Sequence, residues 1–169
     1  MDQSVINFAV YEDGNEYMGM ASVAMPDLTA LTQSISGAGI AGNIDAVILG
    51  HFDAMSMTLN YRTLTEQSMR LFEPRRHNID LRVAQQDEDT VKGEVVVNAI
   101  KHVMVVIPKA YKGGNVAPAS ANDASGEFTV RYWKTYRDGK KVLEVDPLNF
   151  IFEVNGVDYL ADVRKALGK

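Results

Sequence analysis

Most of this chain alternates apolar and polar residues with a period of two, and that alternation restricts it to β-strands. The clearest case is 55–62, MSMTLNYR. One face carries Met55, Met57, Leu59 and Tyr61, and the other carries Ser56, Thr58, Asn60 and Arg62. A strand of this kind buries one side and leaves the other in water, as antiparallel sheets commonly do. We therefore expect a mainly β, antiparallel fold.

Two further strand pairs are predicted from turn signals. Residues 79–86 and 94–107 flank the turn-rich segment DEDTVKG, which indicates a hairpin. Residues 5–11 and 17–25 flank EDGN and are expected to pair in the same way.

A stronger hairpin signal lies near the carboxyl end. Residues 128–137 are rich in β-branched and aromatic side chains and end in Asp138-Gly139, a dipeptide typical of type I′ turns. The chain then returns over 140–145. The expected register places Thr135 opposite Val142 and Trp133 opposite Glu144.

Two short helices are predicted. Thr63-Leu64-Thr65-Glu66 reads as a capping box, and Pro74 ends the helix that follows it. The second helix is expected to be capped by Asp158 and to end at Gly168. The apolar residues are Leu64, Leu71 and Phe72 in the first helix and Leu160, Val163 and Leu167 in the second.

The remaining segments, 33–46, 86–93 and 108–126, are predicted to be loops. The last is rich in Gly, Pro, Ala, Ser and Asn, and a loop of that length is usually functional or mobile. A length of 169 residues fits one domain, 1–169.

Composition excludes several classes of function. The chain has no cysteine, so disulfides, zinc–thiolate sites and thiol nucleophiles are excluded. Its net charge of −5 argues against a binder of nucleic acid or anionic membranes. The first residues, MDQSVINFAVYEDG, lack the pattern of a signal peptide, and no apolar run reaches the length of a transmembrane helix. These observations favour a soluble protein made in the cytoplasm.

The segment Gly37-Ala38-Gly39-Ile40-Ala41-Gly42 is formally a G-x-G-x-x-G string. A dinucleotide fingerprint follows a buried strand, opens a helix and is followed about twenty residues later by an acidic residue. Here a mostly polar segment precedes the string, the β-branched NIDAVILG follows it, and position 62 is arginine. A turning loop between strands is the favoured interpretation.

No catalytic, cofactor-binding or metal-ligating residues are predicted. His51, His77 and His102 are far apart and have no metal-ligand spacing. The acidic run at 87–89 lacks the glycine and closing glutamate of an EF-hand and reads as a solvated turn. Open sheet edges invite unwanted pairing, and long loops carry an entropic cost in a cysteine-free β domain. Both costs disappear if other copies of the chain cover the edges and loops, which favours self-assembly.

Several segments, in the same order, resemble the major tail tube proteins of contractile-tailed bacteriophages and of phage-tail-like bacteriocins. Residues 136–146, YRDGKKVLEVD, are similar to the late hairpin of that family. The stretch 150–168, FIFEVNGVDYLADVRKALG, resembles the segment that opens its terminal helix. The glycine string and Asp53-Ala54-Met55-Ser56-Met57 also have counterparts there.

This resemblance implies two packed antiparallel sheets, as a sandwich or partial barrel, with one flanking helix and a short C-terminal helix. It also implies a structural, non-catalytic subunit of which six copies form a ring with a continuous inner β-barrel. Stacked rings form the tube that a contracting sheath drives through a cell envelope. The implied partners are other copies, the sheath, baseplate, tail-terminator and tape measure proteins, and DNA passing non-specifically through the lumen. The implied location is the virion, after assembly in the host cytoplasm.

The resemblance also implies roles for individual residues. The candidate inter-subunit loop consists of Gly37, Gly39, Ile40, Gly42, Asn43 and Ile44. The candidate lumen lining is Ser56, Thr58, Asn60 and Arg62, for which an ordinary solvated strand face is the alternative.

Two other classes remain open on the sequence. One is a ring protein of the type VI secretion kind, and the other is a monomeric β-sandwich binding module that uses the glycine loop for a ligand. Phage and headless bacteriocin are also left open, because the cargo of the lumen is not encoded in the subunit.

Overall fold

The computed structural model describes residues 2–17 and 19–169. Met1, in the predicted domain, and Met18, in the predicted strand 17–25, lie outside the described residues. The strands are β1 (Asp2–Glu12), β2 (Asn15–Tyr17), β3 (Met20–Ala24), β4 (Ala30–Ile35), β5 (Ile44–Phe52), β6 (Met55–Tyr61), β7 (His77–Asp89), β8 (Glu94–Lys112), β9 (Ala124–Arg137), β10 (Lys140–Asp146), β11 (Ile151–Val154) and β12 (Val157–Asp158). The helices are α1 (Glu66–Arg70) and α2 (Ala161–Ala166).

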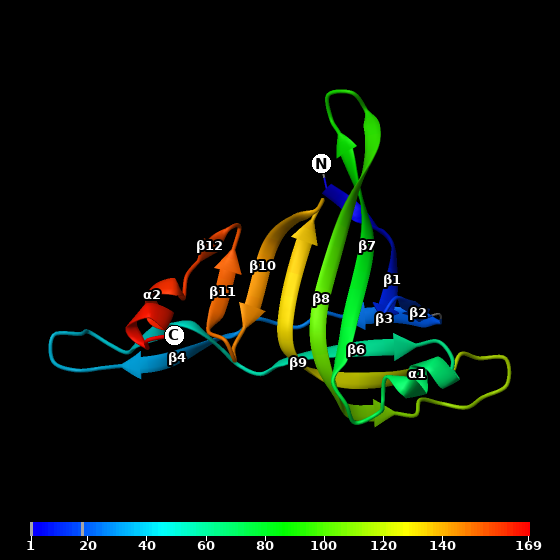
Figure 1. The fold of residues 1–169 in the computed structure, drawn as a ribbon, viewed down its shortest axis with the longest axis horizontal. Coiled ribbons are helices and arrows are strands. Elements are labelled where there is room, and N and C mark those ends of the chain that lie inside the picture. The colour runs from blue at the N-terminus through cyan, green and yellow to red at the C-terminus, as the bar shows by residue number, and fades with distance from the viewer. Residues whose placement is uncertain (1, 18) are drawn as a thin grey trace.

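The strands form two antiparallel sheets, which confirms the mainly β prediction (Figure 1). The larger sheet has the order β12-β11-β10-β9-β8-β7-β1-β2, and β6 adds to β9 and carries β3 on its other side. The smaller sheet is the hairpin β4–β5. The sheets do not close into a barrel.

The long strands β8 and β9 bend the larger sheet into two packed layers (Figure 1). Where they bend, two residues have no partner in the β8–β9 register. The first is Arg131 of β9, between the pairs Val105–Tyr132 and Val106–Val130, and the second is Lys109 of β8. A β-bulge adds a residue to one strand, bends it and increases its twist, so a strand can pass from one layer to the next. One layer therefore contains β1, β7 and β10, and the other contains β3 and β6.

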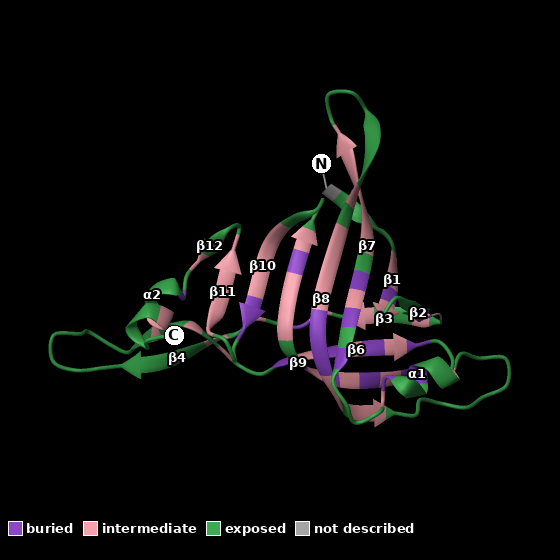
Figure 2. Cartoon of the chain, viewed as in Figure 1, coloured by how far each residue is buried: buried purple, intermediate pink, exposed green. Residues whose placement is uncertain are grey.

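The core lies between these layers. Along β6 the buried residues are Met55, Met57, Leu59 and Tyr61, as their spacing predicts. They join one apolar cluster with Val10 of β1, Ile79 of β7, Met104 of β8 and Phe128 of β9. Figure 2 shows that the buried segments gather where the two layers cross.

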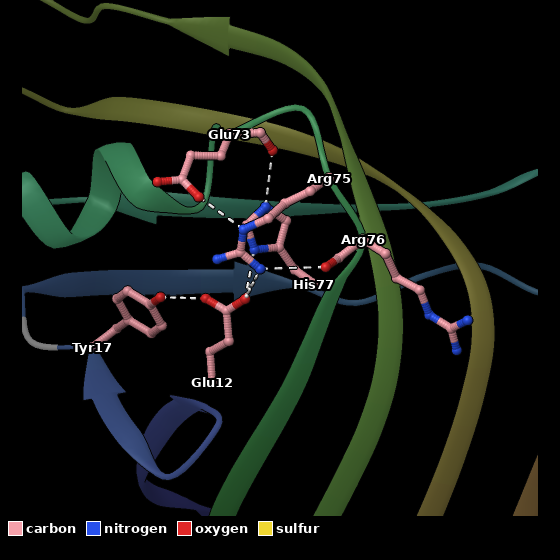
Figure 3. A network of polar contacts seen from close by, with 6 residues as sticks. All are labelled: Glu12, Tyr17, Glu73, Arg75, Arg76 and His77. Carbon is pink, nitrogen blue, oxygen red and sulfur yellow. Dashed lines mark hydrogen bonds and ion pairs between the residues drawn. The ribbon is translucent and has the colours of Figure 1, made fainter.

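A buried polar network ties β1, β2 and the start of β7 together (Figure 3). The Glu12 carboxylate accepts hydrogen bonds from the Tyr17 hydroxyl and from Nη1 of Arg75, the latter at 3.0 Å. His77, fully buried, has Nδ1 at 2.6 Å from Oε1 of Glu12 and Nε2 at 3.0 Å from the carbonyl of Glu73. Both ring nitrogens therefore lie against oxygen atoms, one of a carboxylate and one of a backbone carbonyl.

The charge of Glu12 is stabilised by these contacts. Burial alone would raise the pKa of the Glu12 carboxyl, but hydrogen bonds from Tyr17, His77 and Arg75 outweigh it and lower that pKa below its ordinary value. Burial, together with the neighbouring carboxylate, raises the pKa of the Tyr17 hydroxyl, which therefore stays a donor.

The predicted hairpin at 128–145 forms, but its register differs from the prediction. Leu143 lies opposite Thr135 and Val145 lies opposite Trp133, one residue later than expected. The pairing skips Val142, because a second β-bulge inserts this residue into β10.

The strand predicted at 17–25 divides in two. Residues of β2 return along β1, with Val10 opposite Tyr17, as the EDGN turn predicts. The later part is β3, which pairs with β6 instead, with Val23 opposite Leu59. A short break at Gly19, at φ +82°, separates β2 from β3.

Both predicted helices are present and shorter than expected. The capping box of α1 joins Thr65 and Ser68, two residues after the predicted start, and Leu64 is exposed. At α2 no side chain caps the first turn, because Asp158 instead accepts from the Leu160 amide and pairs with Arg164. Leu160 is buried, Val163 is half-buried and Leu167 is exposed.

The loops are shorter than predicted, because strand pairing continues into all three segments. The glycine loop spans 36–43, the acidic turn 90–93, and the small-residue loop 113–123. Pairing of β8 with β9 extends to Lys112 and Ser125, despite the small residues nearby.

We expect Glu12→Gln to lower the free energy of unfolding by roughly 2–3 kcal/mol at pH 7, because it leaves buried donors without their anion. The pKa of Glu12 is lowered by folding, so its contribution is present above the ordinary carboxyl pKa and is lost as pH falls through the folded value. The difference between wild type and variant should therefore shrink at acidic pH. Urea unfolding of unassembled protein measures both effects, with the exposed Glu16→Gln as the control. A constant difference across pH would contradict this role of the charge.

Candidate inter-subunit surfaces

The hairpin β4–β5 projects from the body of the molecule as an arm (Figure 1). Its base rests on the carboxyl-terminal segments. A Cβ added to Gly50 would lie 2.5 Å from Cδ2 of Leu160, so only glycine permits this approach. Phe52 packs edge-on against Phe152 of β11, with ring centroids 4.9 Å apart. The arm is therefore fixed at its base and free at its tip.

The structure brings the candidate inter-subunit residues together at this tip. The glycine loop joins β4 to β5 through a turn in which the Ile40 amide donates to the carbonyl of Gly37 at 3.1 Å. Gly39 and Gly42 have φ of +94° and +130°, a region that glycine adopts readily. All six predicted residues, Gly37, Gly39, Ile40, Gly42, Asn43 and Ile44, are exposed.

The loop lacks the geometry of a phosphate site. Gly42 is followed by β5, as the β-branched sequence predicts, so the glycine loop does not open a helix. The open space around Gly39 and Gly42 also shows that conformation, not crowding within the subunit, requires glycine there.

The arm exposes more apolar surface than the sequence analysis identified. Its exposed apolar residues are Leu31, Ile35, Ile40, Ile44, Val47, Ile48 and Leu49. A concentration of exposed apolar side chains on one projecting element favours a site of protein association. The run Val47-Ile48-Leu49 was the available signal, although in sequence it is indistinguishable from a buried strand.

The other candidate set lies on the layer that contains β6. Ser56, Thr58 and Asn60 are half-buried between the core positions, and Arg62 follows the strand and is exposed. Asn60 donates to the Ser22 hydroxyl of β3 at 2.8 Å. On the other side, Ser56, Thr58 and Asn60 lie opposite Thr129, Glu127 and Ser125 of β9. Neighbouring strands thus extend the polar face that the alternation predicts.

Several strand edges remain available for pairing, and those of β3 and β12 are two of them. Among the described strands, β3 pairs only with β6 and β12 pairs only with β11. The outer backbone groups of such edge strands can pair with another chain.

The three histidines lie in different environments. His77 belongs to the buried network, and His51 is exposed on the arm. His102 lies 2.8 Å from the Thr135 hydroxyl, and burial lowers the pKa of its imidazole. Within 2–17 and 19–169, no group of three His, Asp or Glu side chains is placed to hold a metal ion. No helix in the same ranges has the length and apolarity needed to cross a membrane.

Two solved structures share the fold. Both come from an extracellular contractile injection system termed PVC, in its extended state. One is the sheath/tube terminator, with a TM-score of 0.53 and 11% identity, covering 78% of this chain and 94% of that one. The other is from the sheath–tube complex, with a TM-score of 0.51 and 13% identity, covering 77% and 88%.

Sequence comparison identifies the family. The tail tube protein of Escherichia phage P2 is 28% identical over 162 residues, which span 94% of this chain and 93% of the relative. The sequence also matches the family described as phage tail tube protein FII over residues 2–168, nearly its whole length. The chain therefore belongs to the phage tail tube protein FII family.

Proposed function

We propose that this protein is the structural subunit of the inner tube of a contractile tail, in which six copies form a ring and rings stack into a hollow conduit. The observation that carries the proposal is the projecting arm, whose apolar residues are exposed in a single copy. Covering them requires another chain, and the open edges of β3 and β12 offer backbone groups for closing a ring.

The implied partners follow from the same assembly. Contraction of a sheath around the tube drives it through a cell envelope. Baseplate and terminator proteins lie at the two ends of the tube, and a tape measure protein sets its length. The solved structures with the same fold come from a sheath–tube complex and a sheath/tube terminator, which supports partners of these kinds. The protein acts as a component of the virion after assembly in the host cytoplasm, without catalysis.

The polar face that contains Ser56, Thr58, Asn60 and Arg62 is the proposed lumen lining. Short hydroxyl and amide groups on a subunit of net charge −5 give DNA little to bind, so it slides through. This role applies if the particle is a phage.

Size-exclusion chromatography and negative-stain electron microscopy of the purified protein test the assembly. We expect sixfold rings and stacked tubes. A monodisperse monomer at high concentration would instead support the binding module. Rings or tubes would support either the contractile-tail tube or a ring protein of the type VI secretion kind.

We expect Gly39→Val to leave a folded monomer and to block tube formation. Valine is strained at φ +94° and meets no atom of its own subunit within 4 Å, so the change reshapes only the tip of the arm. Gly37→Ala is the matched control, because Gly37 has open space and no positive φ. Circular dichroism checks folding and electron microscopy counts tubes. Normal tubes from Gly39→Val would exclude a contact at this loop.

The cysteine-free chain allows the lumen to be mapped. In assembled tubes, Thr58→Cys should react with a small maleimide and resist a maleimide on a bulky polymer, whereas the unassembled variant should react with both. Mass spectrometry measures the labelled fraction. Equal labelling of tubes by the bulky reagent would place this face on the outside.

A further inference from the structure

A hollow of about 290 Å³ lies where β7 begins, and it combines apolar walls with positive charge. Val105 and Ile107 of β8 line it together with Leu148, which is 70% exposed. Arg76 and Arg131 also line it. This combination suits a segment that carries both apolar side chains and carboxylates.

The two arginines are not neutralised within the subunit. The side chain of Arg76 points away from the buried network (Figure 3), and Arg131 is the exposed bulged residue of β9. Among the described residues, neither forms an ion pair. Asp146, which also lines the hollow, instead accepts from the amides of Leu148 and Asn149.

A segment of matching chemistry lies at the other end of the same strands. The β7–β8 tip, residues 87–97, projects beyond the rest of the sheet (Figure 1). It carries four carboxylates, Asp87, Glu88, Asp89 and Glu94, and one lysine, Lys92. Asp87 pairs with Arg137 of the same subunit at 3.3 Å, whereas Glu94 is exposed. Its apolar residues are unusually open, with Val91, Val95 and Val97 exposed by 92%, 60% and 60%.

The hollow and the tip lie at opposite ends of one strand pair. β7 begins beside the hollow at His77 and ends in the tip at Asp89, and its 13 residues span about 40 Å at roughly 3.3 Å per residue. A second copy shifted along the strands brings its hollow to the tip of the first. Such a head-to-tail contact uses two different surfaces and therefore repeats into a stack.

We propose that the β7–β8 tip of one copy docks into the hollow flanked by Arg76 and Arg131 of a second copy in the next ring. The valines cover Val105, Ile107 and Leu148, and the carboxylates of Asp89 and Glu94 neutralise the arginines. This inference rests on the proposed tube assembly and assigns one contact that holds successive rings together.

Disulfide trapping tests the contact directly. In the double variant Val91→Cys/Leu148→Cys, both substituted side chains are exposed and the chain has no other cysteine. A disulfide needs Cβ atoms about 4 Å apart, so only docking of the tip at the hollow allows it. We expect oxidation of assembled protein to give a ladder of covalent oligomers on a non-reducing gel.

Each single variant should give no ladder, and Val91→Cys/Val157→Cys is the matched control, because Val157 is also exposed but lies on β12. Tubes that form without a ladder would overturn this docking and leave the proposed function intact. Wild-type protein that forms no rings or tubes would overturn the proposed function, and this contact with it.

Charge reversal provides a second, independent measurement. Arg76→Glu/Arg131→Glu should raise the protein concentration needed for stacking about tenfold or more, with ring formation retained, because like charges then face each other. Lys140→Glu/Lys165→Glu, at exposed lysines of β10 and α2, is the control, because it changes the net charge by the same amount. Unchanged stacking of the double arginine variant would overturn the proposal.

Discussion

The fold depends on the burial of one face of β6 beneath the bend of β8 and β9. Met57, Leu59 and Phe128 are almost completely buried where the two layers cross, and all three belong to the apolar cluster of the core. The bend that makes this possible coincides with the bulges at Arg131 and Lys109. Without those extra residues the long strands would remain in one layer, and the apolar face of β6 would have no cover.

The same arrangement determines what remains outside the core. Because β6 is covered on one face only, its polar face, shared with β3 and β9, is left for solvent or for a lumen. The bulge at Arg131 also turns a cationic side chain outward at the edge of the crossing. The surfaces proposed for assembly thus arise from the same features that close the core, and they lie on strand edges and projections.

The parts of this structure that sequence predicts are those governed by local pattern. The alternation at 55–62, the Asp138-Gly139 turn and the hairpin around 90–93 each act over a few neighbouring residues, and each forms. The errors concern pairing at a distance. The bulge at Val142 shifts one register by a residue, and β3 leaves the amino-terminal hairpin for β6, because both outcomes depend on partners far along the chain. The glycine loop 36–43 lies at the end of the β4–β5 arm. Its position also depends on a distant partner, because Gly50 at the base of the arm contacts Leu160.

The apolar arm and the acidic hairpin tip both leave apolar side chains exposed in a single copy. A monomer would gain stability by folding Ile44 and Val47 onto its body, yet the arm is held away from it by Gly50, Phe52 and their contacts at its base. Rigid attachment lowers the entropy lost when the arm binds another chain, since its conformation is already fixed. In the proposed assembly, the glycines at its tip shape a surface for a copy of the same protein, and the exposed valines beyond β7 contact another copy in the same way.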